Sequence, residues 1–300
     1  MIVNSFVVKG GGGLSLPSWT QTTLPTSAVW YSVTYGKGKF VAVTDNKNIA
    51  AYSEDGINWT QTTLPTSARW RSVTYGNGKF VAMAYSNNIA AYSEDGISWT
   101  QTTLPASAGW RSVTYGNGKF VVVAYNNNVA AYSNDGINWT KTTMPSSNWW
   151  SVTYGKGKFV AVMSNNNNVA AYSEDGINWT QTTLPASANW YSVAYGNGKF
   201  VAVAYYNNVA AYSEDGISWT QTTLPASASW YSVTYGNGKF VAVTDNNNVA
   251  AYSEDGISWT QTTLPTSAKW RSVTYGNDKF VAVASSDIAA YIKDSYDKWA

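Results

Sequence analysis

The chain has 300 residues, a net charge of +2, an aromatic content of 15% and a charged content of only 12%. So small a positive charge, with lysines recurring at fixed positions, argues against a nucleic-acid partner. The sequence has no cysteine and no histidine, which excludes disulfides, thiolate metal sites and a histidine general base. We therefore predict no bound metal and no cofactor.

The N-terminal residues 1–13 end in four consecutive glycines. Such a segment is expected to be flexible, either as a tether to a larger surface or particle assembly or as a disordered start. Its apolar run is too short for a secretory signal, and no stretch of about 18 apolar residues predicts a membrane span. We expect residues 14–300 to form a single domain.

A 40-residue repeat organises that domain. Periods of about 40 to 45 residues are typical of four-stranded propeller blades. In one unit the residue pattern predicts strands at 70–76, 80–84, 89–93 and 99–104, which we call strands A to D from the centre of the propeller outward. Tryptophans mark the period at positions 19, 59, 99, 139, 179, 219, 259 and 299.

Turn residues separate these strands. Asn77 and Gly78 form the Asn-Gly pair of a tight A–B hairpin, and the sequence SEDG reverses the chain between strands C and D. Strands B and C are apolar on both faces, as expected for blades stacked face to face. Pro65 is expected to end strand D, because proline donates no ladder hydrogen bond.

The number of strands predicts how the domain closes. Strand D occurs seven times and the A–B–C trio seven times, with a lone strand D at the start of the chain and a lone trio at its end. We predict an all-β fold, a seven-bladed β-propeller of four-stranded antiparallel blades, in which the N-terminal outer strand completes the last blade. This closure removes two exposed sheet edges.

The C–D turn, SEDGINW at residues 53–59, resembles the Asp-box of bacterial neuraminidase repeat propellers, whose pattern is Ser-x-Asp-x-Gly-x-x-Trp. One residue between Asp and Gly is missing here, and six turns carry the resemblance. In that family the box is a structural turn. Asp55 is accordingly expected to accept backbone N–H groups, Gly56 to adopt a strained φ and Trp59 to pack beneath the loop. Each box has too few carboxylates for calcium.

The units differ mainly at the end of the blades opposite these turns. Drift after duplication would also make loops vary, but Tyr, Trp, Arg, Asn and Asp are typical of recognition surfaces. We therefore predict a ligand-binding face made of the residue that follows each strand-A tryptophan and of residues in the B–C loops. The chosen residues are Tyr31, Arg71, Arg111, Trp150, Tyr191, Tyr231 and Arg271 from strand A, and Asp45, Tyr85, Tyr125, Tyr205 and Asp245 from the loops.

For this face we predict a non-catalytic, lectin-like glycan-binding function, on a monomer with several repeated sites. The alternative is a protein-binding, adhesin or receptor-binding display domain that uses the same face for a host-surface or protein ligand. The family resemblance also implies a sialidase-like glycosidase with Arg71, Arg111 and Arg271 as its arginine triad. That reading is disfavoured, because all five glutamates lie in the boxes and none remains to activate a tyrosine. We predict no enzymatic activity.

Overall fold

The computed structural model describes residues 18–125 and 127–293. Over these ranges the fold is all-β, from β1 to β25, and contains no helix, so the described residues include no helix that could span a membrane. The predicted flexible segment 1–13 lies outside the described residues. The division of the chain at residue 13 therefore stays a prediction.

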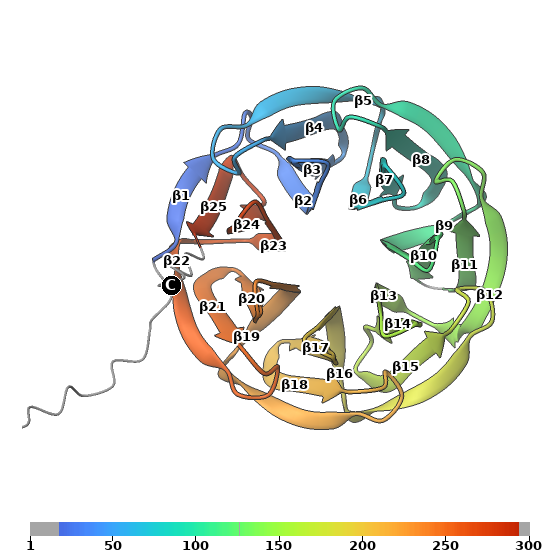
Figure 1. Ribbon diagram of the computed structural model, residues 1–300, viewed down its shortest axis with the longest axis vertical. Helices are drawn as coiled ribbons and strands as arrows, with labels where there is room; N and C mark the ends of the chain where they lie inside the picture. The colour runs from blue at the N-terminus through green and yellow to red at the C-terminus, as the bar shows by residue number, and fades with distance from the viewer. Residues whose placement is uncertain (1–17, 126, 294–300) are drawn as a thin grey trace, which may run out of the picture.

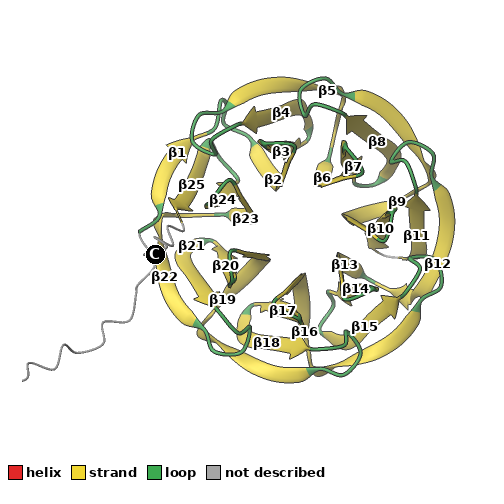
Figure 2. Ribbon diagram, viewed as in Figure 1, coloured by secondary structure: helices red, strands yellow, loops and turns green. Residues whose placement is uncertain are grey.

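Four-stranded antiparallel blades repeat along the chain and are arranged radially around a central axis (Figure 1, Figure 2). Strands A to D of the sequence run from the axis outward, as predicted. The separate innermost strands are β2 (Val29–Gly36), β6 (Trp70–Gly76), β13 (Trp149–Gly155) and β23 (Trp270–Gly276). The second strands are β3 (Lys39–Asp45), β7 (Lys79–Ala84), β10 (Lys119–Tyr125), β14 (Lys158–Met163), β17 (Lys199–Tyr205), β20 (Lys239–Asp245) and β24 (Lys279–Ala284).

The third strands of the blades are β4 (Lys47–Ser53), β8 (Asn87–Ser93), β11 (Asn127–Ser133), β15 (Asn167–Ser173), β18 (Asn207–Ser213), β21 (Asn247–Ser253) and β25 (Ile288–Lys293). The separate outer strands are β1 (Thr20–Thr23), β5 (Thr60–Ala68), β12 (Thr140–Ser147) and β22 (Thr260–Ala268). Three long strands, β9 (Thr100–Gly116), β16 (Thr180–Gly196) and β19 (Thr220–Gly236), each serve as the outer strand of one blade and then as the innermost strand of the next.

One blade combines the two ends of the chain. Strand β1 pairs antiparallel with β25, with Thr20 opposite Tyr291 and Thr23 opposite Ile288. The sheet order is β1, β25, β24, β23. The N-terminal outer strand thus covers the edge that the last three strands would otherwise expose.

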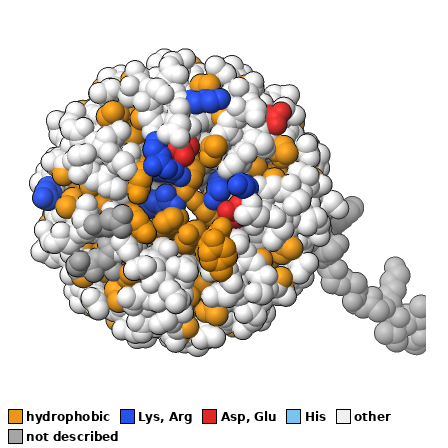
Figure 3. Space-filling model, turned by 180° about the vertical axis from the view of Figure 1, so that it is seen from behind, with side chains coloured by type: hydrophobic (Ala, Val, Ile, Leu, Met, Phe, Trp, Pro, Cys, Tyr) orange, Lys and Arg blue, Asp and Glu red, His pale blue; other side chains and the backbone are white. Residues whose placement is uncertain are grey.

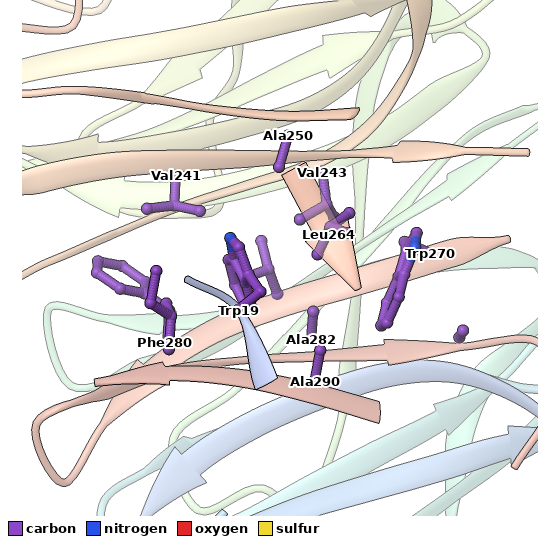
Figure 4. Close-up of a cluster of buried hydrophobic side chains, with 12 residues drawn as sticks. Trp19, Val241, Val243, Ala250, Leu264, Trp270, Phe280, Ala282 and Ala290 are labelled. Atoms are coloured by element: carbon purple, nitrogen blue, oxygen red, sulfur yellow. The ribbon is translucent and has the colours of Figure 1, made fainter. Parts of the chain in front are cut away.

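Neighbouring blades pack face to face through apolar side chains. The cluster of Figure 4 includes Val241 of β20, Leu264 of β22 and Phe280 of β24, together with Trp19 and Trp270. The second strands are buried on both faces, as predicted. The third strands differ from the prediction: in β4 only the central Ala50 and Ala51 are buried on both faces, and the residues before them are half-buried or exposed. Each strand-A tryptophan also donates its indole N–H to a backbone carbonyl four residues earlier, as Trp70 does to Thr66 at 3.2 Å.

Hydrogen bonds from serine link the innermost strands of adjacent blades. The hydroxyl of Ser32 accepts the backbone N–H of Val73 at 3.1 Å, and Ser272 near the end of the chain accepts that of Val33 near its start, also at 3.1 Å. Equivalent bonds join each of the remaining pairs of neighbouring innermost strands. One polar contact therefore recurs between all successive blades.

The Asn-Gly prediction for the A–B turn is confirmed, because Asn77 and Gly78 both have positive φ, 47° and 76°. The prediction that Pro65 ends strand D is wrong, because β5 continues through it to Ala68. Pairing with β4 slips between Thr63 and Ala68. Pro65 lies within this irregularity, where no ladder bond requires its missing N–H.

Candidate functional site

Each innermost strand carries a β-bulge at the residue after its tryptophan. In β2, Trp30 lies opposite Thr44 and Ser32 lies opposite Val43, so Tyr31 has no partner in the ladder. The same slip occurs in the other six innermost strands. A bulge changes the direction of a side chain. All seven strand-A residues predicted from the sequence are bulge residues.

These seven bulge residues line one cavity on the channel axis, together with the serine that follows each of them. The cavity has a volume of about 100 Å³. Figure 3 shows this face, where hydrophobic, cationic and acidic side chains gather around the central opening. We call the seven bulge residues, with the B–C loop residues and Arg69 that contact them, the channel mouth.

Tyr31 lies at the centre of the channel mouth. Its hydroxyl hydrogen-bonds the hydroxyl of Tyr231 and accepts a hydrogen bond from Nη2 of Arg111 at 2.5 Å. The guanidinium of Arg71 lies 4.0 Å from the centroid of its ring. Burial raises the pKa of Tyr31, but the charges of Arg111 and Arg71 outweigh it and lower the pKa below its ordinary value. Burial and the charge of Tyr31 raise the pKa of Tyr231.

Two aspartates pair with arginines beside this centre. Asp45 contacts Arg71 at 2.8 Å and Arg69 at 3.3 Å. Asp245, which is 4% exposed, contacts Arg271 at 3.1 Å and accepts a hydrogen bond from the hydroxyl of Tyr205 at 2.9 Å.

Arg111 differs from the other three arginines of the mouth. It is 9% exposed, and no carboxylate among the described residues pairs with it. Its described polar partners are the hydroxyls of Tyr31 and Tyr231, and its guanidinium lies 3.4 Å from the ring centroid of Trp150. The four arginines and two aspartates of the mouth leave two positive charges in excess.

A series of contacting aromatic rings, which we call the aromatic ladder, begins at Trp150 beside Arg111. Trp150 stacks on Tyr191 with ring centroids 4.2 Å apart, and Tyr191 stacks on Tyr205 at 4.3 Å. The ladder ends at Tyr206, whose ring centroid lies 4.0 Å from that of Tyr205. Burial raises the pKa of Tyr191 and of Tyr205, so both rings stay neutral in ordinary buffers.

All twelve residues predicted for the site belong to one network of contacts. Among the loop residues, Tyr85 lies beneath Arg69 and Arg71, and Tyr125 packs edge-on against Trp150. Sequence reasoning missed Arg69 and Tyr206. Arg69 precedes a strand-A tryptophan, and Tyr206 follows another tyrosine in a loop where related units have Asn or Ser; a comparison of the aligned loops could have found Tyr206.

The opposite face carries the repeated C–D turns. Oδ1 of Asp55 accepts the backbone N–H groups of Ile57 and Asn58, both at 2.8 Å. Gly56 has a φ of 73°, and Trp59 packs against Phe40. Burial alone would raise the pKa of Asp55, but these hydrogen bonds lower it to about 2. The three turn roles expected from the sequence are confirmed. The relation to the Asp-box family stays a prediction.

The fold is that of a β-propeller, and comparison with solved structures places the chain in this class. Streptogramin B lyase is 15% identical with a TM-score of 0.83, covering 92% of this chain and 97% of its own. A catalytically inactive histidine-to-alanine variant of virginiamycin B lyase from Staphylococcus aureus with quinupristin is 14% identical with a TM-score of 0.82, covering 92% and 99%. YCF48 bound to D1 peptide is 17% identical with a TM-score of 0.75, covering 94% and 100%.

The sequence matches no protein-family model and no curated protein. At identities this low the structural likeness shows the fold alone. The similar propellers include an enzyme and a protein solved with a peptide. The prediction that the chain is not an enzyme therefore stays a prediction.

The prediction of a lectin-like, glycan-binding module is wrong. The similar structures are a lyase and a peptide-bound propeller, and none of their descriptions names a glycan. The packing of the site also argues against glycan binding. The rings expected to receive the apolar face of a sugar stack on one another instead, as Trp150 does on Tyr191. The repeated sites expected on separate blades are joined into one connected mouth.

Proposed function

We propose that the channel mouth binds an acidic segment of a peptide or protein, with Arg111 as the residue that holds its carboxylate. The observation that carries this proposal is that Arg111 is buried and has no carboxylate partner among the described residues. A buried guanidinium without a carboxylate is costly, and an anionic ligand would offset that cost with charge-assisted hydrogen bonds.

The size and surroundings of the cavity support the same ligand class. A volume of about 100 Å³ admits a carboxylate group or a few water molecules but no folded element. The excess of arginine over aspartate at the mouth favours an anion over a cation. YCF48 is solved with a peptide bound, so a chain of this fold can hold a peptide.

We further propose that the mouth binds this ligand without transforming it. The sequence has no histidine, and both aspartates of the mouth are held in ion pairs with arginine. This removes the residues that most often act as general base. The arginines and aromatic rings of the channel mouth supply binding energy rather than proton transfer.

We propose that the blades number seven and form a closed ring. The pairing of β1 with β25 and the hydrogen bond from Val33 to Ser272 support this arrangement. A closed ring keeps the seven bulge residues around one axis, and the single cavity that they line depends on it.

Isothermal titration calorimetry with an octaglutamate peptide tests the binding proposal, and octaglutamine of the same length is the uncharged control. Arg111→Gln is expected to weaken octaglutamate binding about tenfold or more, because it removes charge-assisted hydrogen bonds. The matched variant Lys119→Gln removes the same charge from the opposite face.

An equal loss in Arg111→Gln and Lys119→Gln would mean that octaglutamate responds only to the net charge of the protein. No binding of octaglutamate to the wild-type protein would also contradict the proposal. Thermal unfolding of each variant, followed by circular dichroism, distinguishes lost binding from lost folding.

A further inference from the structure

Tyr206 is an exposed aromatic side chain in an unfavourable backbone conformation. It is 71% exposed, the only exposed aromatic residue among the parts of the chain that the structure describes. Its φ is 72°, in the left-handed region. Bulky side chains rarely adopt this region, whereas Asn tolerates it.

Equivalent loops in other units place small polar residues at this position. Asn46, Ser86 and Asn246 have φ values of 59°, 65° and 65°. Tyr206 thus has the backbone conformation of its counterparts but a side chain that suits it less. A solvent-exposed ring at such a position lowers stability on both counts. Strained residues concentrate at functional sites, so the conformation of Tyr206 indicates a functional role.

The aromatic ladder connects Tyr206 to Arg111. The successive steps from the guanidinium of Arg111 through Trp150, Tyr191 and Tyr205 to Tyr206 measure 3.4, 4.2, 4.3 and 4.0 Å. The ladder is therefore at most about 16 Å long, a distance that about five residues of extended peptide span. Tyr206 lies within reach of a peptide whose carboxylate is held by Arg111.

We propose that Tyr206 binds an aromatic side chain of the ligand, no more than about five residues from the acidic residue that Arg111 holds. This inference rests on the proposed function and narrows its ligand to an acidic peptide with an aromatic residue at that spacing. One side of the Tyr206 ring packs on Tyr205, which orients it, and its exposed part is available for ring–ring contact. Arg111 at one end and Tyr206 at the other then fix the direction of the peptide.

Calorimetry with two synthetic peptides tests this inference. The first has two adjacent glutamates, a four-residue Gly-Ser spacer and a phenylalanine. The second has alanine in place of the phenylalanine. The wild-type protein is expected to bind the phenylalanine peptide about fivefold to tenfold more tightly, the range expected of an aromatic pair.

Two substitutions of Tyr206 complete the test. Tyr206→Asn restores the residue type of Asn46 and Asn246, and it is expected to abolish the preference for phenylalanine and to raise the unfolding temperature. Tyr206→Phe retains the ring and is expected to retain the preference. Loss of affinity together with gain of stability distinguishes a binding residue from a structural one.

Equal affinity of the wild-type protein for the two peptides would overturn the role of Tyr206 and leave the acidic-ligand proposal standing. A preference that persists in Tyr206→Asn would place the aromatic contact elsewhere and also overturn the inference. If neither peptide binds and octaglutamate does not bind either, the proposed function itself fails.

Discussion

The guanidinium of Arg111 and the hydroxyl of Tyr31 meet on the channel axis, 2.5 Å apart, although they belong to different blades. This contact favours the phenolate form of Tyr31, because an ionised oxygen accepts the hydrogen bond more strongly than a neutral one. Arg71 adds a second positive charge beside the same ring. Tyr31 and Arg111 therefore act as one electrostatic unit.

Tyr31 is expected to ionise before the other tyrosines. Its pKa is lowered by Arg111 and Arg71 against the effect of burial, so an ultraviolet titration should detect one tyrosinate below pH 10. Because the folded state binds this proton more weakly than the unfolded state, the stability from Tyr31 is complete above the unfolded pKa of about 10 and is lost as pH falls through the folded pKa. Tyr31→Phe should abolish the early step, and an unchanged titration in that variant would contradict the assignment.

Asp45 is expected to stabilise the fold by pairing with a buried arginine. The side chain of Arg71 is only 7% exposed, so Asp45→Asn leaves a buried guanidinium without its carboxylate. We expect this substitution to lower the free energy of unfolding by about 3 kcal/mol, as measured by urea denaturation. Glu54→Gln is the control, because the pair of Glu54 with Lys39 is exposed and its loss should cost less than about 1 kcal/mol. Equal effects would contradict a structural role for the Asp45 pair.

Gly116 is expected to be intolerant of any side chain. A Cβ at this position would lie 2.0 Å from the ring of Tyr154 in the adjacent blade. Gly116→Ala should therefore lower the free energy of unfolding by about 2 kcal/mol through overpacking. In a Tyr154→Gly background the same substitution should cost much less, because both the clashing ring and the Cβ of Tyr154, which would lie 2.4 Å from the new Cβ, are gone. Additive losses in the double variant would show that the clash is not the cause.

The C–D turns are expected to make the protein sensitive to acid. Backbone hydrogen bonds from Asn58 and Ile57 lower the pKa of Asp55 to about 2 against the effect of burial, and Asp95 behaves in the same way. These carboxyls bind protons more weakly when folded. The stability they contribute is present above the unfolded pKa of about 4 and is lost as pH falls towards 2.

Thermal unfolding between pH 5 and pH 2 measures this loss. The variant Asp55→Asn, Asp95→Asn should be less stable than wild type at pH 5 and should lose less of its stability on acidification. A wild-type unfolding temperature that does not change over this range would contradict the assignment.

Much of the fold could be predicted because each unit repeats the same turn residues. Asn77 and Gly78 mark one reversal by their backbone preferences, and Asp55 and Gly56 mark the other. The bulge at Arg71 could not be predicted, since the alternation of the strand gives no sign of an added residue after Trp70. It depends on how the strand is paired with its neighbour.

That the varied residues gather at one end of the blades could be predicted, but their contacts with one another could not. Variation among the units indicated the end of the blades at which residues such as Arg111 and Tyr205 meet. That Tyr205 would be buried beneath Tyr191 depends on the direction of two side chains from different blades. Glycan binding was inferred from residue type alone, and residue type does not reveal that the rings are already occupied by one another.

The serine bonds between innermost strands have a consequence for how such a chain can be rearranged. The bond between Ser272 and Val33 joins residues 239 positions apart, yet its length of 3.1 Å equals that between Ser32 and Val73 in adjacent units. This contact between two blades is thus the same whether or not their innermost strands belong to consecutive units of the chain. In the closed ring that we propose, a circularly permuted gene that began at a different unit would encode the same set of neighbouring blades.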